Sequence, residues 1–175
     1  MNYPKPDEYA DYYSRYIKQI PDNENIIKVL QEDREKLQSL IKSIPEDRGN
    51  YSYAEGKWTV KEVFGHLADV ERVMTYRAMC IARGEKKSIP GFEQDDYVRM
   101  ASFNRRTLKN ISEELLHLRN SAIVLFNSFD EETLLRRGTA NNNEVSVRAL
   151  LFIIAGHELH HMKILNERYL QREII

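Results

Sequence analysis

Apolar residues recur at steps of three and four along four long segments of this chain, and this spacing limits what it can fold into. It places the apolar side chains on one face of an α-helix. The first of these stripes consists of Ile27, Leu30, Leu37, Ile41 and Ile44. Pro45 is expected to end this helix, because proline cannot continue it. Gly and Pro are scarce, with 7 and 5 among 175 residues, so we expect an all-α protein.

Three further segments repeat the pattern. Thr59 and Glu62 form a capping box that opens the second helix, and its stripe consists of Val63, His66, Val70 and Val73. The third stripe consists of Ile111, Leu115, Leu118, Ala122, Leu125 and Phe129. The fourth follows Ser146 and consists of Val147, Leu150, Ile154, His157, His161 and Ile164. Four stripes predict a four-helix bundle, and the long connection between the second and third helices predicts one crossover.

Shorter segments are expected beside the bundle. Amphipathic pieces are predicted at Tyr9–Ile20 and Gln94–Phe103, and one helical turn at Asp130–Arg136. The asparagine-rich stretch from Gly138 to Ser146 is expected to form turns and to rim a site at the bundle end. A chain of this length predicts a single domain over residues 1–175.

Composition excludes several functional classes. The net charge is -1, so the chain lacks the basic excess typical of nucleic-acid binding, and we expect no nucleic-acid partner. Cys80 is the single cysteine, which indicates a reducing compartment. The first residues do not resemble a signal peptide, and no apolar run is long enough to cross a bilayer. We therefore expect a cytoplasmic protein with no membrane partner.

Histidines replace apolar residues at three positions of these stripes. His157 and His161 lie four residues apart on the fourth stripe, and His66 lies on the second. Buried imidazoles without partners are costly, whereas a shared divalent metal satisfies them. We predict a metal site of these three residues, holding zinc or nickel, with iron or manganese as alternatives. His160 lies about 100° around the helix from His161 and is expected beside the site or at a contact between helices, and His117 is expected on the surface.

The stretch His157-Glu158-Leu159-His160-His161 also matches the H-E-x-x-H motif of zinc proteases. The short remainder of the chain offers no third ligand at the spacing of those enzymes, so we discard the protease interpretation. Glu158 is the catalytic candidate, as a base. Its position off the stripe favours contact with a neighbouring helix or with water instead.

Several other residues near the predicted site have simpler interpretations. Glu62 is expected to act in the cap rather than to orient His66, and Asp69 to be a surface acid. Trp58 is expected to pack at the helix entrance. The aromatic first segment is expected to pack in the core, with a dimer surface or a cleft wall as the less favoured alternatives; it contains Tyr9, Tyr12, Tyr13 and Tyr16.

Two motifs together resemble the DinB/YfiT-like superfamily of metal-binding four-helix proteins. The element W-T-x-x-E-x-x-x-H runs from Trp58 to His66, and G-H-E-x-x-H runs from Gly156 to His161. The resemblance covers about Ile27 to Leu170. It implies that His66, His157 and His161 hold a divalent metal completed by water, and that the chain forms a homodimer. It does not imply DNA binding.

The resemblance also implies an activity. The family includes transferases that join bacillithiol or mycothiol to electrophiles, and a thiol-dependent maleylpyruvate isomerase. We therefore expect a metal-dependent enzyme whose partners are a low-molecular-weight thiol and an electrophilic small molecule. A metal-dependent hydrolase and a non-catalytic, metal-binding dimeric scaffold remain as alternatives. An open metal position facing a cleft would favour an enzyme, and a closed shell completed by His160 or a carboxylate would favour the scaffold.

Overall fold

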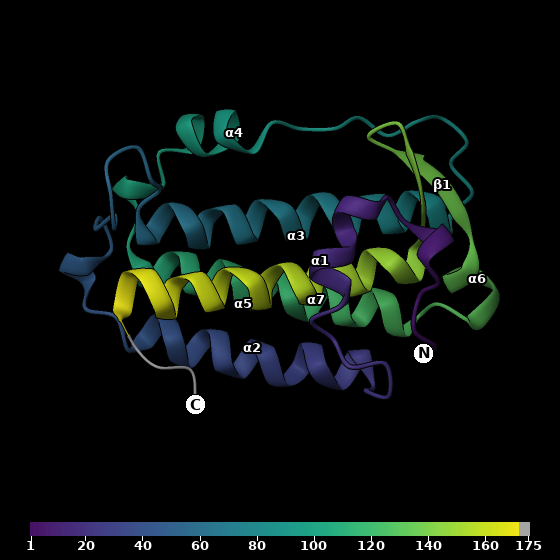
Figure 1. Cartoon of the computed structure of the whole chain (residues 1–175), viewed down its shortest axis with the longest axis horizontal. Helices are drawn as coiled ribbons and strands as arrows, with labels where there is room; N and C mark the ends of the chain where they lie inside the picture. Colours follow the sequence, from purple (N-terminus) through teal and green to yellow (C-terminus); the bar gives the residue numbers. More distant parts are fainter. Residues whose placement is uncertain (172–175) are drawn as a thin grey trace.

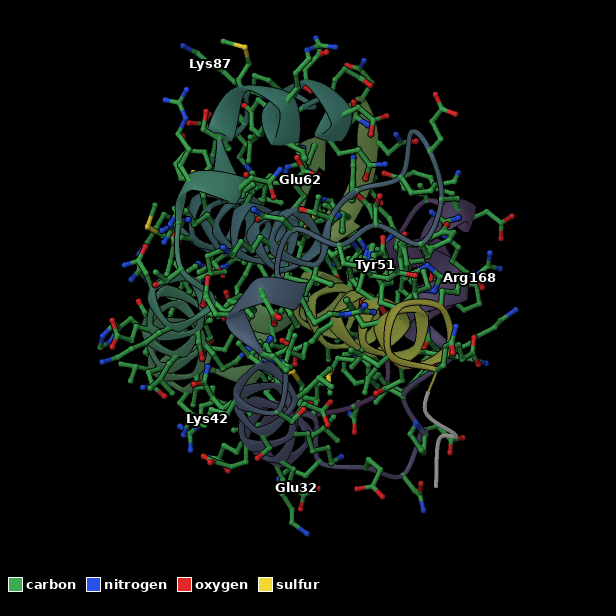
Figure 2. All side chains as sticks on the ribbon, turned by 90° about the vertical axis from the view of Figure 1, so that its left-hand side faces the viewer. Glu32, Lys42, Tyr51, Glu62, Lys87 and Arg168 are labelled. Carbon is green, nitrogen blue, oxygen red and sulfur yellow. The ribbon has the colours of Figure 1, made fainter. Side chains whose placement is uncertain are left out.

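The structure, a computed structural model, describes residues 1–171, and its four long helices run side by side (Figure 1). They are α2 (Ile26–Lys42), α3 (Val60–Ala82), α5 (Leu108–Asn127) and α7 (Val147–Ile164). An end-on view shows that α3 contacts α5 and α7, and that α2 contacts the same two helices from the other side (Figure 2). The predicted all-α four-helix bundle is confirmed. Residues 172–175 of the expected domain lie outside the described residues.

One long crossover connects α3 to α5, which run in the same direction (Figure 1). It spans residues 83–107, returns along the outer side of α3, and contains α4 (Gln94–Ala101) and the 3₁₀ turn η4 (Phe103–Arg105). The expected crossover and its amphipathic piece are therefore confirmed. No helix within residues 1–171 is long and apolar enough to cross a membrane.

Short elements surround the bundle. The N-terminal segment contains the 3₁₀ turns η1 (Pro6–Glu8) and η2 (Asp11–Tyr13) and the single-turn helix α1 (Ser14–Ile17), so the expected amphipathic piece at Tyr9–Ile20 is only partly helical. A 3₁₀ turn, η3 (Glu46–Arg48), follows α2. The turn expected near Asp130 is α6 (Glu131–Leu135), and a π-helical stretch, η5 (Leu165–Leu170), follows α7.

Side-chain caps fix where the long helices begin. Thr59 Oγ1 accepts a hydrogen bond from the Glu62 N–H, and Glu62 Oε2 accepts one from the Thr59 N–H at 2.7 Å. This is the predicted capping box. Ser146 caps α7 in a similar way, because its hydroxyl accepts from the Ala149 N–H. The capping box sets the start of α3 and thereby the rotational position of His66 one turn later.

The buried faces of α3 and α5 rotate away from the predicted stripes. On α5 the buried residues include Arg119 and Phe126, whereas Leu118 and Leu125 are only half-buried. On α3 Val73 is likewise half-buried. The predicted stripes alternate steps of four and three, a 3.5-residue period, whereas an ideal helix has 3.6 residues per turn. The contact face therefore drifts with each heptad. It leaves Val73, Leu118 and Leu125 half-buried, while the other residues of these two predicted stripes are buried.

The first two-thirds of α7 is buried on all sides, not along one stripe. Every residue from Val147 to Glu158 is buried, because α1 covers the face that points away from the bundle. The backbones approach closely at Gly156, where an added Cβ would lie 2.0 Å from the Tyr16 carbonyl oxygen. The glycine of the G-H-E element therefore brings the N-terminal segment onto the helix that carries two of the histidines.

A buried ion pair holds the N-terminal segment against the start of α7. The Glu8 carboxylate accepts hydrogen bonds from the Arg148 guanidinium and from the Ser146 hydroxyl. Burial opposes ionisation, but the bonds from Arg148, the Lys5 N–H and Ser146 hold the pKa of Glu8 at about 2. Glu8 is therefore a permanent anion at physiological pH, and the pair fixes the segment that continues into α1.

The asparagine-rich stretch forms a β-hairpin that the sequence analysis did not predict. Strands β1 (Arg137–Ala140) and β2 (Asn143–Ser146) pair antiparallel. Asn141 and Asn142 form the two-residue turn with φ of 50° and 60°, a backbone conformation that asparagine tolerates well. Ile89 of the crossover forms a parallel bridge with Ala140 and thereby ties the crossover to the hairpin.

Replacing Gly156 with alanine should destabilise the fold by several kcal/mol, because the new methyl group meets rigid backbone at Tyr16. Thermal unfolding would measure the change. Gly91→Ala is the control, since its nearest neighbour is the end of the exposed Asn141 side chain, and its cost should be much smaller. Equal unfolding temperatures for the two variants would contradict the proposed close contact of α1 with α7.

Candidate metal centre

Three histidines from two helices meet between α3 and α7. His66 on α3 and His157 and His161 on α7 each offer one ring nitrogen, and these three nitrogens lie within 4.8 Å of one another. The Nε2 atoms of His66 and His157 are 3.1 Å apart. Two nitrogens that each bind a zinc ion at about 2.0–2.1 Å can lie at most about 4.2 Å apart, so this separation fits a shared ion. The structure thus brings together the three residues that the stripes select.

Burial keeps these imidazoles neutral. It lowers the pKa of His66 to about 4 and that of His161 to about 3, and it holds the pKa of His157 well below its ordinary value. The proximity of the rings to one another lowers the last two further. Neutral imidazole is the form that binds a metal. The triad can therefore accept a divalent cation at neutral pH without first releasing protons.

Aromatic rings enclose the triad on two sides. The Trp58 ring packs against His66 with centroids 4.8 Å apart. Tyr16 of α1 contacts the His157 and His160 rings edge-on at 5.2 and 5.4 Å. Tyr16 therefore belongs to the wall of the site, which corrects the expectation that the first segment packs only in the core. Trp58 stands at the entrance of α3 as expected, and it also covers a candidate ligand.

The other polar candidates lie outside the triad. His160 is half-buried beside His161, with ring centroids 5.3 Å apart, and is not part of the three-nitrogen cluster. His117 is exposed, as expected. Glu62 is engaged by the Thr59 N–H and by Asn104, so its role is the cap. Asp69 lies 3.8 Å from Arg72 and is half-buried.

Glu158 faces the interior of the bundle. Its carboxylate oxygens accept hydrogen bonds from Arg119 at 3.1 and 2.8 Å, and the same guanidinium binds Glu71 at 2.7 and 3.2 Å. All three side chains are almost fully buried. Burial raises the pKa of Glu158, while Arg119 opposes that rise. Glu158 thus contacts a neighbouring helix, as expected for a position off the stripe. Its pairing with Arg119 weakens its candidacy as a base.

A cleft of about 290 Å³ opens beside the triad. Its floor includes His66 and His157, the hairpin tip contributes Asn141, and the N-terminal segment contributes several tyrosines. The expectation that the asparagine-rich stretch rims the site thus agrees with the structure. The complete lining is Tyr12, Tyr13, Arg15, Tyr16, His66, Val70, Met74, Arg77, Phe92, Glu93, Gln94, Asp95, Asn141, Ile153 and His157. The cleft therefore borders two of the three histidines, whose side chains are almost fully buried.

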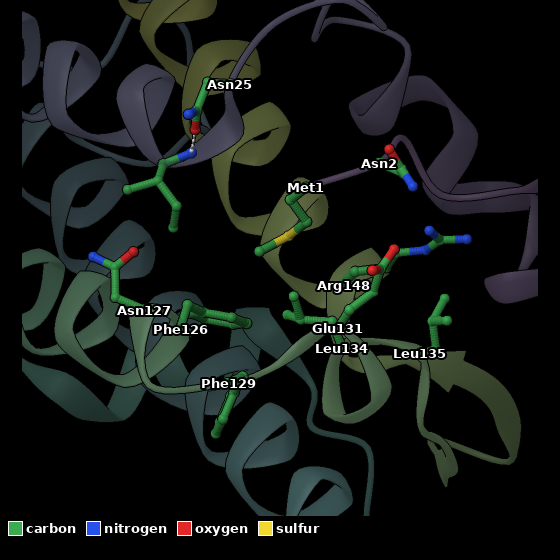
Figure 3. A pocket seen from close by; sticks show the side chains of 11 residues that line it. Met1, Asn2, Asn25, Phe126, Asn127, Phe129, Glu131, Leu134, Leu135 and Arg148 are labelled. Carbon is green, nitrogen blue, oxygen red and sulfur yellow. Dashed lines mark hydrogen bonds between the residues drawn. The ribbon is translucent and has the colours of Figure 1, made fainter.

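A larger cavity, of about 440 Å³, lies elsewhere and contains none of the three histidines (Figure 3). Its walls include Phe126, Phe129 and Leu134, and Arg148 lies near the start of α7. Arg148 precedes His157 by nine residues, or about 13 Å of helix. This cavity is therefore separate from the triad, and its size alone does not make it the candidate active site.

Fold and site together define a four-helix bundle with a three-histidine centre between two of its helices. The family model of the DinB superfamily matches residues 29–165, and the chain belongs to that superfamily. A protein of Oceanobacillus iheyensis named "Putative metal-dependent hydrolase OB0413" is 24% identical over 151 residues, which cover 82% of this chain and 83% of that protein.

Solved structures share the fold. YfiT from Bacillus subtilis, described as "a probable metal-dependent hydrolase with an unusual four-helix bundle topology", superposes with a TM-score of 0.74 at 17% identity and covers 98% of this chain and 95% of its own. The DinB-like YjoA from Bacillus subtilis gives 0.60 at 21% identity, covering 83% and 90%. A mycothiol-dependent maleylpyruvate isomerase gives 0.65 at 13%, covering 83% of this chain and 61% of its own.

Replacing any triad histidine with alanine should abolish stoichiometric metal binding, because two imidazoles of the three cannot hold the ion as tightly. His160→Ala is the matched control and should largely retain the metal. Elemental analysis of untagged protein, purified without chelator, would measure both. Loss of metal from His160→Ala together with retention in His66→Ala would contradict the assignment.

Replacing Arg119 with methionine should destabilise the protein by about 3–5 kcal/mol, because Glu71 and Glu158 would remain buried without their cation. Urea denaturation would measure the change. Lys109→Met removes an exposed ion pair with Glu113 and should cost less than about 1 kcal/mol. A loss for Arg119→Met as small as that of the control would show that the buried network does not support the bundle.

Proposed function

We propose that this protein is a metal-dependent enzyme that transfers a low-molecular-weight thiol to an electrophilic small molecule. His66, His157 and His161 would hold a divalent metal, and the adjoining cleft would take the reactants. A bound divalent metal supplies Lewis acidity, which lowers the pKa of a coordinated thiol or water and so delivers an anionic nucleophile near neutral pH. The observation that supports this proposal most directly is that three neutral, buried imidazoles lie beside an open cleft.

No carboxylate among the described residues of the cleft is well placed to act as a general base, and this favours a thiol over water as the nucleophile. Coordination to a metal lowers the pKa of water from about 15.7 to about 7, whereas a thiol starts from about 8.5 and is fully ionised when coordinated, so the thiol depends less on a general base. Glu158 is paired with Arg119, and the carboxylates that line the cleft, Glu93 and Asp95, stand at its exposed rim. A thiol can lose its proton to solvent without such a base.

The residues of the chain would position the reactants. Trp58 and Tyr16 fix the orientation of the histidine rings through edge and face contacts. Apolar side chains in the cleft, Val70 and Met74 on α3 and Ile153 on α7, would exclude water from the reacting groups. The resemblance to a mycothiol-dependent isomerase supports the thiol, although at 13% identity it shows only the fold.

Hydrolysis is the second candidate, and the names of two relatives favour it. The same triad and cleft would serve, with water in place of the thiol. A non-catalytic metal-binding scaffold agrees less well with the cleft beside the triad. The expected homodimer and cytoplasmic location stay predictions.

Thiol titration of the cobalt-substituted protein would test the proposal. Bacillithiol, mycothiol, glutathione and coenzyme A would be added in turn, and one of them should produce a new thiolate-to-cobalt absorption band. His160→Ala should retain this band, and His157→Ala should lose it together with the metal. Stoichiometric cobalt with no spectral response to any thiol, combined with ester or amide hydrolysis, would replace thiol transfer with the hydrolase.

A further inference from the structure

Arg77 is a buried cation in the wall of the reactant cleft. It follows His66, Val70 and Met74 on α3 at steps of four, four and three, so all four side chains share one face of the helix and line the same cleft. Arg77 is only 2% exposed. The wall of the cleft therefore contains His66 and His157 at one place, and the guanidinium of Arg77, about three turns farther along α3.

The guanidinium has no carboxylate partner within residues 1–171, unlike the other buried arginines. Arg119 binds two glutamates and Arg148 binds Glu8. Arg77 donates instead to the Pro90 carbonyl oxygen at 2.8 Å and to the Met74 sulfur at 3.7 Å, and its buried Nε has no hydrogen-bond partner. A buried charge without a counterion is costly, so the position favours the binding of an anion.

The neighbouring groups do not neutralise Arg77. Tyr13 interacts with Arg77 through a side-chain hydrogen bond, but this phenol is not an anion. Burial and the adjacent Tyr12 raise the pKa of Tyr13 above its ordinary value even though Arg77 lowers it, so the phenol stays neutral. The acidic residues of the cleft, Glu93 and Asp95, are exposed at the rim and form no ion pair with Arg77 in the described part of the chain. An anionic group of a ligand could therefore supply the negative charge that Arg77 lacks within the described residues.

The separation along α3 sets the length of that ligand. Eleven residues from His66 to Arg77 correspond to about 16 Å of helix. The contact of the Arg77 guanidinium with the Met74 sulfur brings this cation back toward His66, so the ligand has to span less than that length of helix. The unpartnered Nε and the adjacent Nη2, which has a second N–H besides the one that Pro90 accepts, lie on one edge of the planar guanidinium, and such an edge matches the two oxygens of a carboxylate.

We propose that Arg77 binds a carboxylate of the substrate, and that the substrate class is an elongated small-molecule carboxylate whose reacting atom lies at the histidine triad. The inference rests on the proposed function only in using the triad as the reaction centre. The carboxylate belongs either to the thiol or to the electrophile, and the experiment separates these two sources.

The test uses hydroxamic acids, which bind catalytic metals whether the enzyme uses a thiol or water. A series of ω-carboxyalkyl hydroxamic acids of increasing chain length, and the matching methyl esters, would be titrated calorimetrically into the zinc-loaded protein. At one chain length the acid should bind about ten- to a hundredfold more tightly than its ester, the range of a charge-assisted hydrogen bond. Arg77→Met should remove this preference and leave the ester affinity unchanged.

Two further variants make the result specific. Arg77→Lys keeps the charge but cannot donate two parallel hydrogen bonds to a carboxylate, so it should retain only part of the preference for the acid over the ester. Arg72→Met removes a half-exposed arginine of α3 that pairs with Glu114, and it should bind like the wild type. Equal affinities of acid and ester at every chain length would overturn the proposal. An equal loss for acid and ester in Arg77→Met would also overturn it, and would assign Arg77 to holding the crossover through Pro90.

A second series identifies the source of the carboxylate. ω-Mercaptocarboxylic acids and ω-mercaptoalcohols would be titrated into the cobalt-substituted protein. An Arg77-dependent preference for the acids places the carboxylate on the thiol, and equal binding of both places it on the electrophile. If the hydroxamates show the preference but no thiol binds, Arg77 keeps its assignment and thiol transfer fails.

Discussion

The packing of α3 against α7 places three imidazoles in the interior of the bundle, and much of the remaining structure adapts to them. Hydrophobic side chains at these positions would stabilise the contact without any partner, whereas buried imidazoles need one. His66 and His157 approach to 3.1 Å, and Trp58 and Tyr16 pack on the rings. A shared divalent cation would satisfy all three nitrogens. The fold is therefore arranged around a binding requirement that close packing alone does not meet.

Within residues 1–171, the buried arginines divide into two that pair with carboxylates and one that does not. Arg119 neutralises carboxylates from α3 and α7, and Arg148 with Glu8 attaches the N-terminal segment to α7. Both networks fix elements that form the site. Arg77 differs because it lines the cleft with a free Nε. Structural roles account for the first two arginines, and the proposed carboxylate binding would account for the third.

The sequence predicts the fold and the triad because both depend on helical periodicity. His66, His157 and His161 are selected by their places in apolar stripes, and the structure brings them together. Helical periodicity does not predict which residues pair with the buried arginines. Arg119 pairs with residues 48 and 39 positions away, and its own burial follows from a drift of the contact face that a strict 3.5-residue pattern hides.

Two other differences have local causes. The hairpin was missed because its strands are only four residues long, although the asparagines at its turn are a known signal for positive φ. The role of Tyr16 in the site wall depends on the close approach at Gly156, which is a tertiary contact between segments far apart in the sequence. Periodicity locates helices and their inward residues, and it does not show which segment covers the outer face.

X-ray absorption spectroscopy of the zinc-loaded protein would test the central claim, an open centre held by three imidazoles, most directly. The account predicts a first shell of three imidazole nitrogens and additional light-atom scattering from exchangeable solvent, which changes when a hydroxamate is added. A closed shell with a fourth imidazole or a protein carboxylate, insensitive to the hydroxamate, would contradict it and indicate a structural metal.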